Sequence, residues 1–301
     1  MRKKLAEIIL AEAKKDKKIV FLTGDLGFNA FEILKNNLGQ RFINAGVAEQ
    51  NMATVAAGMA YSGLKPWIFS IAPFVSIKII EELRNDVCLS NSNVKIIGSG
   101  GGYDYELAGP THHALEDVGV LLTLPNMKIY LPAVIEDVTK IIKKMNREKG
   151  PRYLRLVRSR KITLSLNKFE ACRQVLSGNK VTVLALGSII DKAIEASLRF
   201  KGKIDLWVIG EMPFKPTQKL LNSIKKTGKL IIIEEHVATG GLGQHISLYL
   251  HKHNIKINNF IHLYAKGYIS KRTGSRDFYL KESGLGVESI ISKLKCQMSN
   301  L

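Results

Sequence analysis

The sequence predicts an α/β protein built from two tandem domains with mainly parallel sheets. Three observations support this fold class: short β-branched segments alternate with helical patterns, the alternation stops at one polar stretch, and it then resumes. Such alternation is typical of βαβ units, whose crossover helices make neighbouring strands parallel. A length of 301 residues, of which 46% are hydrophobic, is enough for about two domains with their own cores.

The first series opens with an amphipathic segment in which Leu5, Ile8, Ile9 and Ala13 share one side of a helix. These elements together predict a domain over residues 1–160. The strands expected after the opening helix are Ile19–Thr23, Arg41–Asn44, Pro66–Ile71, Val94–Gly98, Lys128–Leu131 and Tyr153–Val157. The helices expected between them lie near Phe31–Asn37, Glu49–Ser62, Phe74–Ser90, Ala114–Leu124 and Val134–Arg147.

The second series follows a polar stretch that has charges but few large apolar residues, which predicts a linker over residues 161–179. The remainder, residues 180–301, is expected to form the second domain. Its expected strands are Val181–Ala185, Ile204–Ile209, Leu230–Glu234 and Asn259–Leu263. Its expected helices lie near Ile189–Phe200, Thr217–Thr227, Leu242–His253 and Gly286–Cys296.

The net charge of +19 raises the question of a nucleic-acid partner. The lysines are scattered over helices and their ends, and no aromatic RNA-binding motif, zinc finger or long basic tail accompanies them. We therefore expect no nucleic acid as a partner; anionic sugar phosphates or an acidic partner subunit fit the excess charge better.

Other features argue against secretion and membrane insertion. No apolar stretch approaches the roughly 20 residues that span a bilayer, and Glu7 and Glu12 interrupt the N-terminal apolar run, which therefore does not resemble a signal peptide. Cys88, Cys172 and Cys296 are widely spaced and form no CxxC pair, so neither a disulfide framework nor a zinc site is expected. We expect a soluble, cytoplasmic protein with no membrane contact and no metal ligands of its own.

Active sites of open α/β sheets gather at the carboxyl ends of the strands, and unusual residues follow four strands of the first series. Asp25 lies in a Gly-bearing turn, where the pattern favours an aspartate that caps the next helix. Glu49 falls in the first turn of a helix rich in Ala, Gly and Met, which looks buried. It is either a partner of the helix dipole or a carboxyl group held for chemistry, with its pKa raised by desolvation.

Two further segments of this series lie at the same predicted edge. Phe74, just after Pro73, is by default a core side chain, and the alternative is a stacking platform for a flat ligand. His112 and His113 follow a stiff Gly-Pro-Thr turn and are either caps or surface residues, unless further ligands make them a metal site. In the second series, a tight turn at Gly240–Gly243 is favoured over an anion site at the helix that follows.

Four motifs in this order resemble the C-terminal two-thirds of transketolases. They are Gly46-Val-Ala-Glu-Gln-Asn-Met, Gly109-Pro-Thr-His-His, Leu124-Pro-Asn-Met with Pro132-Ala133, and Glu234-Glu-His with Gly240-Gly-Leu-Gly. The likeness covers nearly the whole chain and implies a pyrimidine-binding domain followed by the family's C-terminal domain, with thiamine diphosphate as cofactor.

The resemblance also implies roles for four residues at the cofactor. Glu49 resembles the glutamate that hydrogen-bonds the aminopyrimidine ring, which promotes the tautomer that removes the thiazolium C2 proton. Phe74 resembles an aromatic side chain that packs on the pyrimidine. Ile77 stands at a position that is aromatic in some relatives, and Asp25 resembles an acidic residue near the cofactor.

The expected substrate residues match the family only in part. His112 resembles the active-site histidine near the substrate oxygens, and Arg158 resembles an arginine that grips the sugar phosphate. Many transketolases have an aspartate where this chain has Ala108, and a phosphate-binding histidine where it has Gly100. These departures predict an atypical sugar acceptor.

The family holds Mg²⁺ and the diphosphate with a Gly-Asp-Gly motif followed by Asn-Asn, and the sequence has no Gly-Asp-Gly. The resemblance therefore implies that Mg²⁺ is held by a separate N-terminal transketolase subunit, in an α2β2 assembly. The chain would be the C-terminal subunit of a split transketolase, which transfers a two-carbon ketol unit from a ketose to an aldose. The alternatives are the β subunit of a 2-oxoacid dehydrogenase E1, a deoxyxylulose-phosphate synthase-like enzyme, and a non-catalytic partner subunit.

Overall fold

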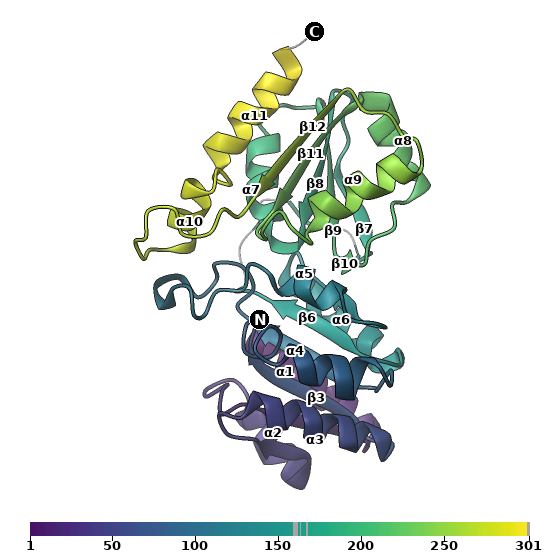
Figure 1. Ribbon diagram of the computed structural model, residues 1–301, viewed down its shortest axis with the longest axis vertical. Helices are drawn as coiled ribbons and strands as arrows, with labels where there is room; N and C mark the ends of the chain where they lie inside the picture. Colours follow the sequence, from purple (N-terminus) through teal and green to yellow (C-terminus); the bar gives the residue numbers. More distant parts are fainter. Residues whose placement is uncertain (159–161, 163, 167, 300–301) are drawn as a thin grey trace. The chain divides into compact units, whose positions relative to one another are not determined.

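The computed structural model describes residues 1–158, 162, 164–166 and 168–299. The chain forms two compact units (Figure 1). One comprises Met1–Gly101 with Gly119–Ser159, and the other comprises Gly102–Val118 with Arg160–Leu301. The segment Gly102–Val118 therefore leaves the first unit and packs within the second.

The first unit is built on a parallel sheet, as the sequence predicts. Its strands lie in the order β5-β6-β4-β3-β1-β2, and the pairing of β1 with both β2 and β3 sets Thr23 beside Asn44 and Phe69. The carboxyl ends of these three strands therefore share one edge. The strands are β1 (Ile19–Thr23), β2 (Phe42–Asn44), β3 (Lys65–Ile71), β4 (Lys95–Ser99), β5 (Lys128–Tyr130) and β6 (Arg152–Leu156).

Helices cover this sheet because each has one apolar face. The first helix buries Leu5, Ile8, Ile9 and Ala13, as expected, and packs against the second and sixth helices. The third packs against β3 and against a π-helical segment. The helical segments are α1 (Arg2–Lys15), α2 (Glu32–Leu38), η1 (Gly39–Arg41), α3 (Glu49–Tyr61), α4 (Ile80–Glu82), the π-helix η2 (Leu83–Cys88), η3 (Glu106–Ala108), α5 (Asp117–Leu122) and α6 (Ile135–Arg147).

Three helical expectations need correction. The helix expected at Phe74–Ser90 is divided into turns, α4 and η2, because wide backbone hydrogen bonds such as Lys78 N to Pro73 O replace the regular α pattern. α5 begins only at Asp117, since the backbone of Ala114 pairs in extended form with Gly102. α3 buries one face only and leaves the other, which includes Tyr61, exposed.

Lys95 is a fully buried lysine at the start of β4. Its Nζ donates hydrogen bonds to the backbone carbonyls of Glu148 (2.8 Å) and Gly150 (2.9 Å). Burial, with a contribution from the nearby Arg152 charge, lowers the pKa of Lys95 to about 7. The structure therefore holds an amine whose charge is easily lost near neutral pH.

The second unit contains a second sheet in the order β12-β11-β8-β9-β7. Its pairs are parallel except for β7, which runs antiparallel to β9. Figure 1 shows α7 and α11 on one face of this sheet and α8 and α9 on the other. The strands are β7 (Cys172–Leu176), β8 (Val181–Leu186), β9 (Ile204–Ile209), β10 (Glu211–Met212), β11 (Lys229–Glu234) and β12 (Asn259–Tyr264), and the helices are η4 (Gly187–Ile189), α7 (Ile190–Ser197), α8 (Gln218–Thr227), α9 (Leu242–Lys252), α10 (Arg276–Glu282) and α11 (Val287–Ser299).

The predicted fold class, two α/β sheets that are mostly parallel, is confirmed. Three elements of the second unit were not predicted: β7, which lies within the expected linker, β10 and α10. The proposed domain limit at residue 160 lies outside the described residues. Across the part of the chain that is described, no helix is long and apolar enough to cross a membrane.

Candidate active site

Glu49 is the first residue of α3 and lies where the carboxyl ends of β1 and β3 meet. Its side chain is 1% exposed. One carboxylate oxygen, Oε1, accepts a hydrogen bond from Ser70 Oγ at 2.9 Å, and Oε2 accepts one from Lys78 Nζ at 2.9 Å. Ser70 belongs to β3, and Lys78 lies in the turns that follow it. The three residues therefore form a buried cluster at the sheet edge.

The charge on Glu49 follows from two opposing effects. Burial acts to raise the pKa of the Glu49 carboxyl, but the hydrogen bonds from Lys78 and Ser70 outweigh it and leave the pKa below its ordinary value. The expectation of a raised pKa is therefore wrong for this chain by itself, because an ammonium group stands at the carboxylate. The structure holds a buried, ionised carboxylate at the start of a helix, where the helix dipole also favours negative charge.

Gly24 leaves little free space beside this carboxylate. A Cβ atom added to Gly24 would lie 3.2 Å from Glu49 Oε1 and 3.4 Å from Ser70 Oγ. Both distances are at or below ordinary contact, so a side chain at position 24 would press on the carboxylate. The glycine after β1 thus sets how deeply Glu49 can sit.

Phe74 is half-buried and lies beside the same cluster. Lys78 Nζ is 5.7 Å from the centroid of its ring, so the ammonium group lies over an aromatic face as well as on a carboxylate. Lys78 is 45% exposed, and it could move aside for a ligand. Ile77, the residue before Lys78, is half-buried too. The structure therefore brings Glu49 and Phe74 together through a lysine that sequence analysis missed.

Asp25 is exposed and has a left-handed backbone, with a φ of 55°. Asn44 Nδ2 donates to Asp25 Oδ1 at 2.8 Å, and Asn44 Oδ1 accepts from the backbone N–H of both Asp25 and Gly46. The expectation that Asp25 caps the next helix is wrong, because α2 begins after Phe31 with no side-chain cap. Asp25 and Asn44 instead line a cavity of about 470 Å³ at the ends of β1 and β2.

His112 lies in the second unit, in the loop between η3 and α5. It is half-buried, with its Nδ1 2.9 Å from Thr111 Oγ1 and its ring centroid 5.8 Å from that of Tyr105. His113 is buried at 3% exposure, and burial is the main cause that lowers its pKa. Neither histidine caps α5, which begins at Asp117. The groups that the described residues bring together include no cluster of three or more His, Cys, Asp or Glu residues that could hold a metal ion.

Arg158 is exposed and lies two residues beyond β6 in the first unit. Because β6 runs parallel to the other strands of its sheet, the residue that follows it lies at the same edge of the sheet as Glu49.

The glycine-rich turn before α9 already has an anion, which comes from the chain itself. The fully buried carboxylate of Glu234 accepts hydrogen bonds from the backbone N–H groups of Leu242 (2.7 Å) and Gly243 (2.9 Å). Its Oε1 also lies 2.6 Å from His262 Nε2. The interpretation of Gly240–Gly243 as a tight turn is therefore correct, and Glu234 takes the place of an external anion.

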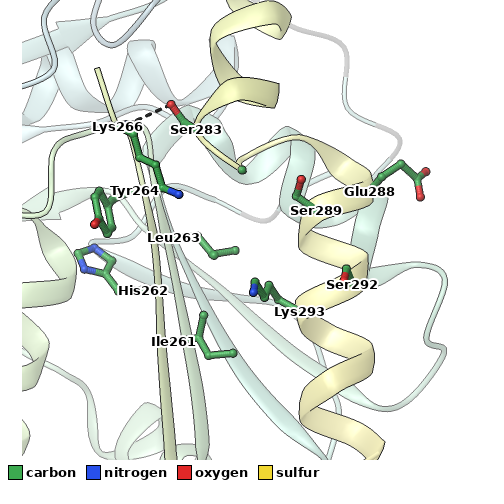
Figure 2. A pocket seen from close by; sticks show the side chains of 11 residues that line it. Ile261, His262, Leu263, Tyr264, Lys266, Ser283, Glu288, Ser289, Ser292 and Lys293 are labelled. Carbon is green, nitrogen blue, oxygen red and sulfur yellow. Dashed lines mark hydrogen bonds between the residues drawn. The ribbon is translucent and has the colours of Figure 1, made fainter. Parts of the chain in front are cut away.

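A second cavity of about 660 Å³ lies between β12 and α11 in the second unit (Figure 2). Lys266, Lys293 and Ser292 are among its lining residues, and Ser283 Oγ accepts a hydrogen bond from the Lys266 backbone N–H at 3.1 Å. None of the sequence-predicted site residues lines it.

Three residues at Glu49 escaped sequence analysis: Gly24, Ser70 and Lys78. Ser70 had a weak signal, since it is a polar residue near the carboxyl end of an apolar strand. Lys78 stands four residues after Phe74, a spacing that sets two side chains on one side of a helical turn. Its contact with Glu49 joins residues 29 apart in the sequence, which a local pattern does not reveal.

Comparison with known proteins assigns a family to both units. The model for "Transketolase, pyrimidine binding domain" matches residues 1–161, and the model for "Transketolase, C-terminal domain" matches residues 170–289. One of the two subunits of an apulose-4-phosphate transketolase from Phocaeicola vulgatus is 33% identical over 80% of each chain. A 6-deoxy-6-sulfo-D-fructose transketolase subunit from Clostridium sp. is 31% identical over 81% of this chain and 78% of its own.

A solved structure described as a split-gene transketolase in an inactive β4 tetramer superimposes with a TM-score of 0.84. It is 27% identical to this chain, and the match covers 99% of this chain and 97% of that one.

Proposed function

The chain belongs to the transketolase family, and from this premise we propose that it is the C-terminal subunit of a split transketolase that depends on thiamine diphosphate. It would transfer a two-carbon ketol unit from a ketose to an aldose once its partner has assembled with it. The observation that carries the proposal is the buried, ionised carboxylate of Glu49, held at the carboxyl edge of a parallel sheet beside Phe74.

The residues of the first unit fit the aminopyrimidine half of the cofactor. Glu49 supplies a buried acceptor for a ring nitrogen, Phe74 supplies an aromatic face, and Gly24 keeps the space beside the carboxylate narrow. Asp25 and Ile77 complete the proposed cofactor set. When bound, thiamine diphosphate supplies the carbanion that takes up the two-carbon unit. The chain's own contribution is to hold the ring and to place a carboxylate at the nitrogen that gains a proton.

Lys78 bears on this fit. In the chain by itself its ammonium group occupies Oε2 of Glu49, which is one of the two oxygens that a ring nitrogen could reach. Cofactor binding therefore requires Lys78 to swing away or to share the carboxylate, and its 45% exposed side chain has room to do so.

A partner subunit is supported by apolar surface that flanks the candidate site. Phe28 is 75% exposed and Val47 is 77% exposed, and they stand three and two residues from Asp25 and Glu49 in the sequence. Such side chains are more often covered in an assembly. We propose that an N-terminal transketolase subunit covers them and supplies the diphosphate and Mg²⁺ ligands, in an α2β2 complex.

We propose His112 and Arg158 as the substrate-binding residues, with His112 near the reacting oxygens and Arg158 at a phosphate or another anionic group. Ala108 and Gly100 replace two polar residues that many transketolases use. Two similar proteins are named for apulose 4-phosphate and for 6-deoxy-6-sulfo-D-fructose. These names support an atypical sugar as the substrate here. The domain limits at residues 160 and 180 also remain proposals.

The test is calorimetric titration of thiamine diphosphate with Mg²⁺, first into this chain and then into this chain with its candidate partner subunit. Tight binding to the mixture alone supports the proposal. Tight binding to the isolated chain contradicts the placement of the diphosphate site on a partner. Pyruvate decarboxylation by the assembled protein would instead favour a 2-oxoacid dehydrogenase.

Glu49→Gln tests the site itself, with Glu7→Gln on the exposed face of α1 as the matched control. We expect Glu49→Gln to lower kcat by roughly 100-fold or more while the complex still assembles. Unchanged turnover would favour a non-catalytic subunit. Equal turnover of xylulose 5-phosphate with ribose 5-phosphate would contradict the atypical substrate.

A further inference from the structure

The loop that carries His112 is built into the second unit. Gly102 and Ala114 form an antiparallel bridge, with N···O distances of 2.8 and 3.0 Å, which closes the loop at its base. The backbone N–H of Val237, just beyond β11, donates to Leu115 O at 2.9 Å. The segment 102–118 is thus tied at both ends to the unit whose sheet contains β11.

A buried ion pair anchors the first end of this loop. Glu235, 3% exposed, accepts a hydrogen bond from Tyr103 N at 2.9 Å and is held by the guanidinium of Arg276 at 2.5–2.9 Å. Gly102 has a φ of +67°, and a Cβ there would lie 2.6 Å from Glu235 Oε1. The carboxylate therefore packs directly on the loop backbone, and only a glycine leaves it room.

Tyr103 extends this anchor with its side chain. The ring is fully buried and stacks on Tyr279 with centroids 4.9 Å apart. Its hydroxyl donates to Gly267 O and accepts from Gly267 N, and it lies 3.1 Å from Ser283 Oγ. Burial raises the pKa of Tyr103 to about 12, so the hydroxyl remains a donor at physiological pH.

His113 anchors the other end, directly beside His112. Its Nε2 lies 3.0 Å from Glu106 O and its Nδ1 lies 3.1 Å from Tyr268 Oη. A carbonyl oxygen only accepts, so Nε2 carries the proton, and in the neutral ring Nδ1 accepts from the Tyr268 hydroxyl. The same rings stack at 5.7 Å. Tyr268 therefore fixes both the tautomer and the plane of the residue next to His112.

We propose that the C-terminal domain takes part in catalysis by holding the His112 loop, with Tyr268 as a positioning residue that acts on His112 through His113. This inference rests on the proposed function, because it assumes that His112 contacts the sugar. It gives the C-terminal domain a task that depends on none of the cofactor-binding residues. The loop would keep its place relative to β11 and α10 even when the cofactor is absent.

Tyr268→Phe tests the proposal, because it removes the hydroxyl and keeps the stacked ring. Tyr264→Phe, on β12 in the same unit, is the matched control with the same chemical change. In the assembled enzyme we expect Tyr268→Phe to lower kcat/KM for the sugar roughly 3- to 10-fold, the range that one hydrogen bond spans, mainly through KM. The dissociation constant of thiamine diphosphate should change by less than about twofold. Unchanged kcat/KM would overturn the proposal, as would an equal loss of cofactor affinity.

Amide hydrogen exchange of the isolated chain separates this inference from the proposed function. Tyr268→Phe should speed exchange in residues 102–118 and leave strands β1–β6 unchanged, whereas Tyr264→Phe should leave both unchanged. Exchange in the loop that stays at the wild-type rate would refute the anchoring, whatever reaction the protein catalyses. A wild-type complex without transferase activity, together with faster loop exchange in the variant, would refute the proposed function and keep the anchoring alone.

Discussion

Replacement of Arg276 by methionine is expected to destabilise the second unit strongly. Arg276 is 1% exposed and donates to both oxygens of Glu235, with Nε 2.9 Å from each, and to Asp191 Oδ2 at 3.2 Å. Burial acts to lower the pKa of Arg276, but the Glu235 and Asp191 carboxylates outweigh it, so the guanidinium stays charged. In Arg276→Met a methionine fills much of the volume and leaves Glu235 buried without its counter-charge.

The magnitude follows from that uncompensated charge. Removal of one partner from a buried ion pair costs about 3–5 kcal/mol. A loss of 1 kcal/mol lowers Tm by roughly 2–4 °C in a domain of this size, so Tm should fall by roughly 6–20 °C. Urea denaturation monitored by circular dichroism gives the free energy of unfolding, and calorimetry gives Tm.

Two comparison variants make the reasoning refutable. Asp277→Asn removes the partner of Lys192 in a pair where Asp277 is 62% exposed, and it should cost less than about 1 kcal/mol because water screens such pairs. The double variant Glu235→Met/Arg276→Met removes both charges and should be more stable than Arg276→Met alone. A loss below about 1 kcal/mol for Arg276→Met, or a double variant that is no more stable, would show that the pair is not the anchor described.

Three further predictions concern the first unit. Gly24→Ala should weaken thiamine diphosphate binding to the assembled protein by about 5- to 10-fold, because its Cβ would press on Glu49 Oε1 at 3.2 Å; calorimetric affinity equal to wild type would contradict the tight fit. Gly58→Ala, on α3 with nothing within 4 Å of the added Cβ, should stabilise the isolated chain by about 0.4–1 kcal/mol, measured from the urea midpoint. Lys95 has a pKa of about 7 when folded and a higher one when unfolded, so the unfolded state binds more protons above pH 7. Stability should therefore rise from about pH 7 towards pH 10, and urea midpoints of Lys95→Met that show the same rise would exclude Lys95 as its source.

The strands of both sheets were predictable because β-branched runs such as Ile19–Thr23 and Leu230–Glu234 are apolar on both faces. Parallel strands covered by helices require that composition. β7 escaped prediction because it is an antiparallel edge strand with polar residues, Arg173 and Gln174, in its middle. α10 escaped because it is short and follows a polar stretch, although Ser275, which accepts from the Phe278 N–H, is a recognisable cap.

The candidate site was predictable only as far as local patterns extend. Glu49 stood out because a glutamate opens a helix of small residues, and its burial is confirmed. The sign of its pKa shift was not predictable, because it depends on a balance between desolvation and Lys78, which arrives from another segment of the fold. A similar limit applies to His113: the sequence sets it beside His112, but its role depends on Tyr268, 155 residues away.

The Glu234-Glu235 pair shows how one short motif serves two purposes. Successive side chains of an extended strand point to opposite sides, and β11 ends at the first of these glutamates. Glu234 therefore turns to one side and accepts from the backbone N–H groups that open α9. Glu235 turns to the other and accepts from Tyr103 N at the base of the His112 loop. The first carboxylate closes the domain's own fold, whereas the second joins that fold to the loop. A glutamate-to-glutamine change should then have different consequences at the two positions: lower stability alone at Glu234, and both lower stability and a looser His112 loop at Glu235.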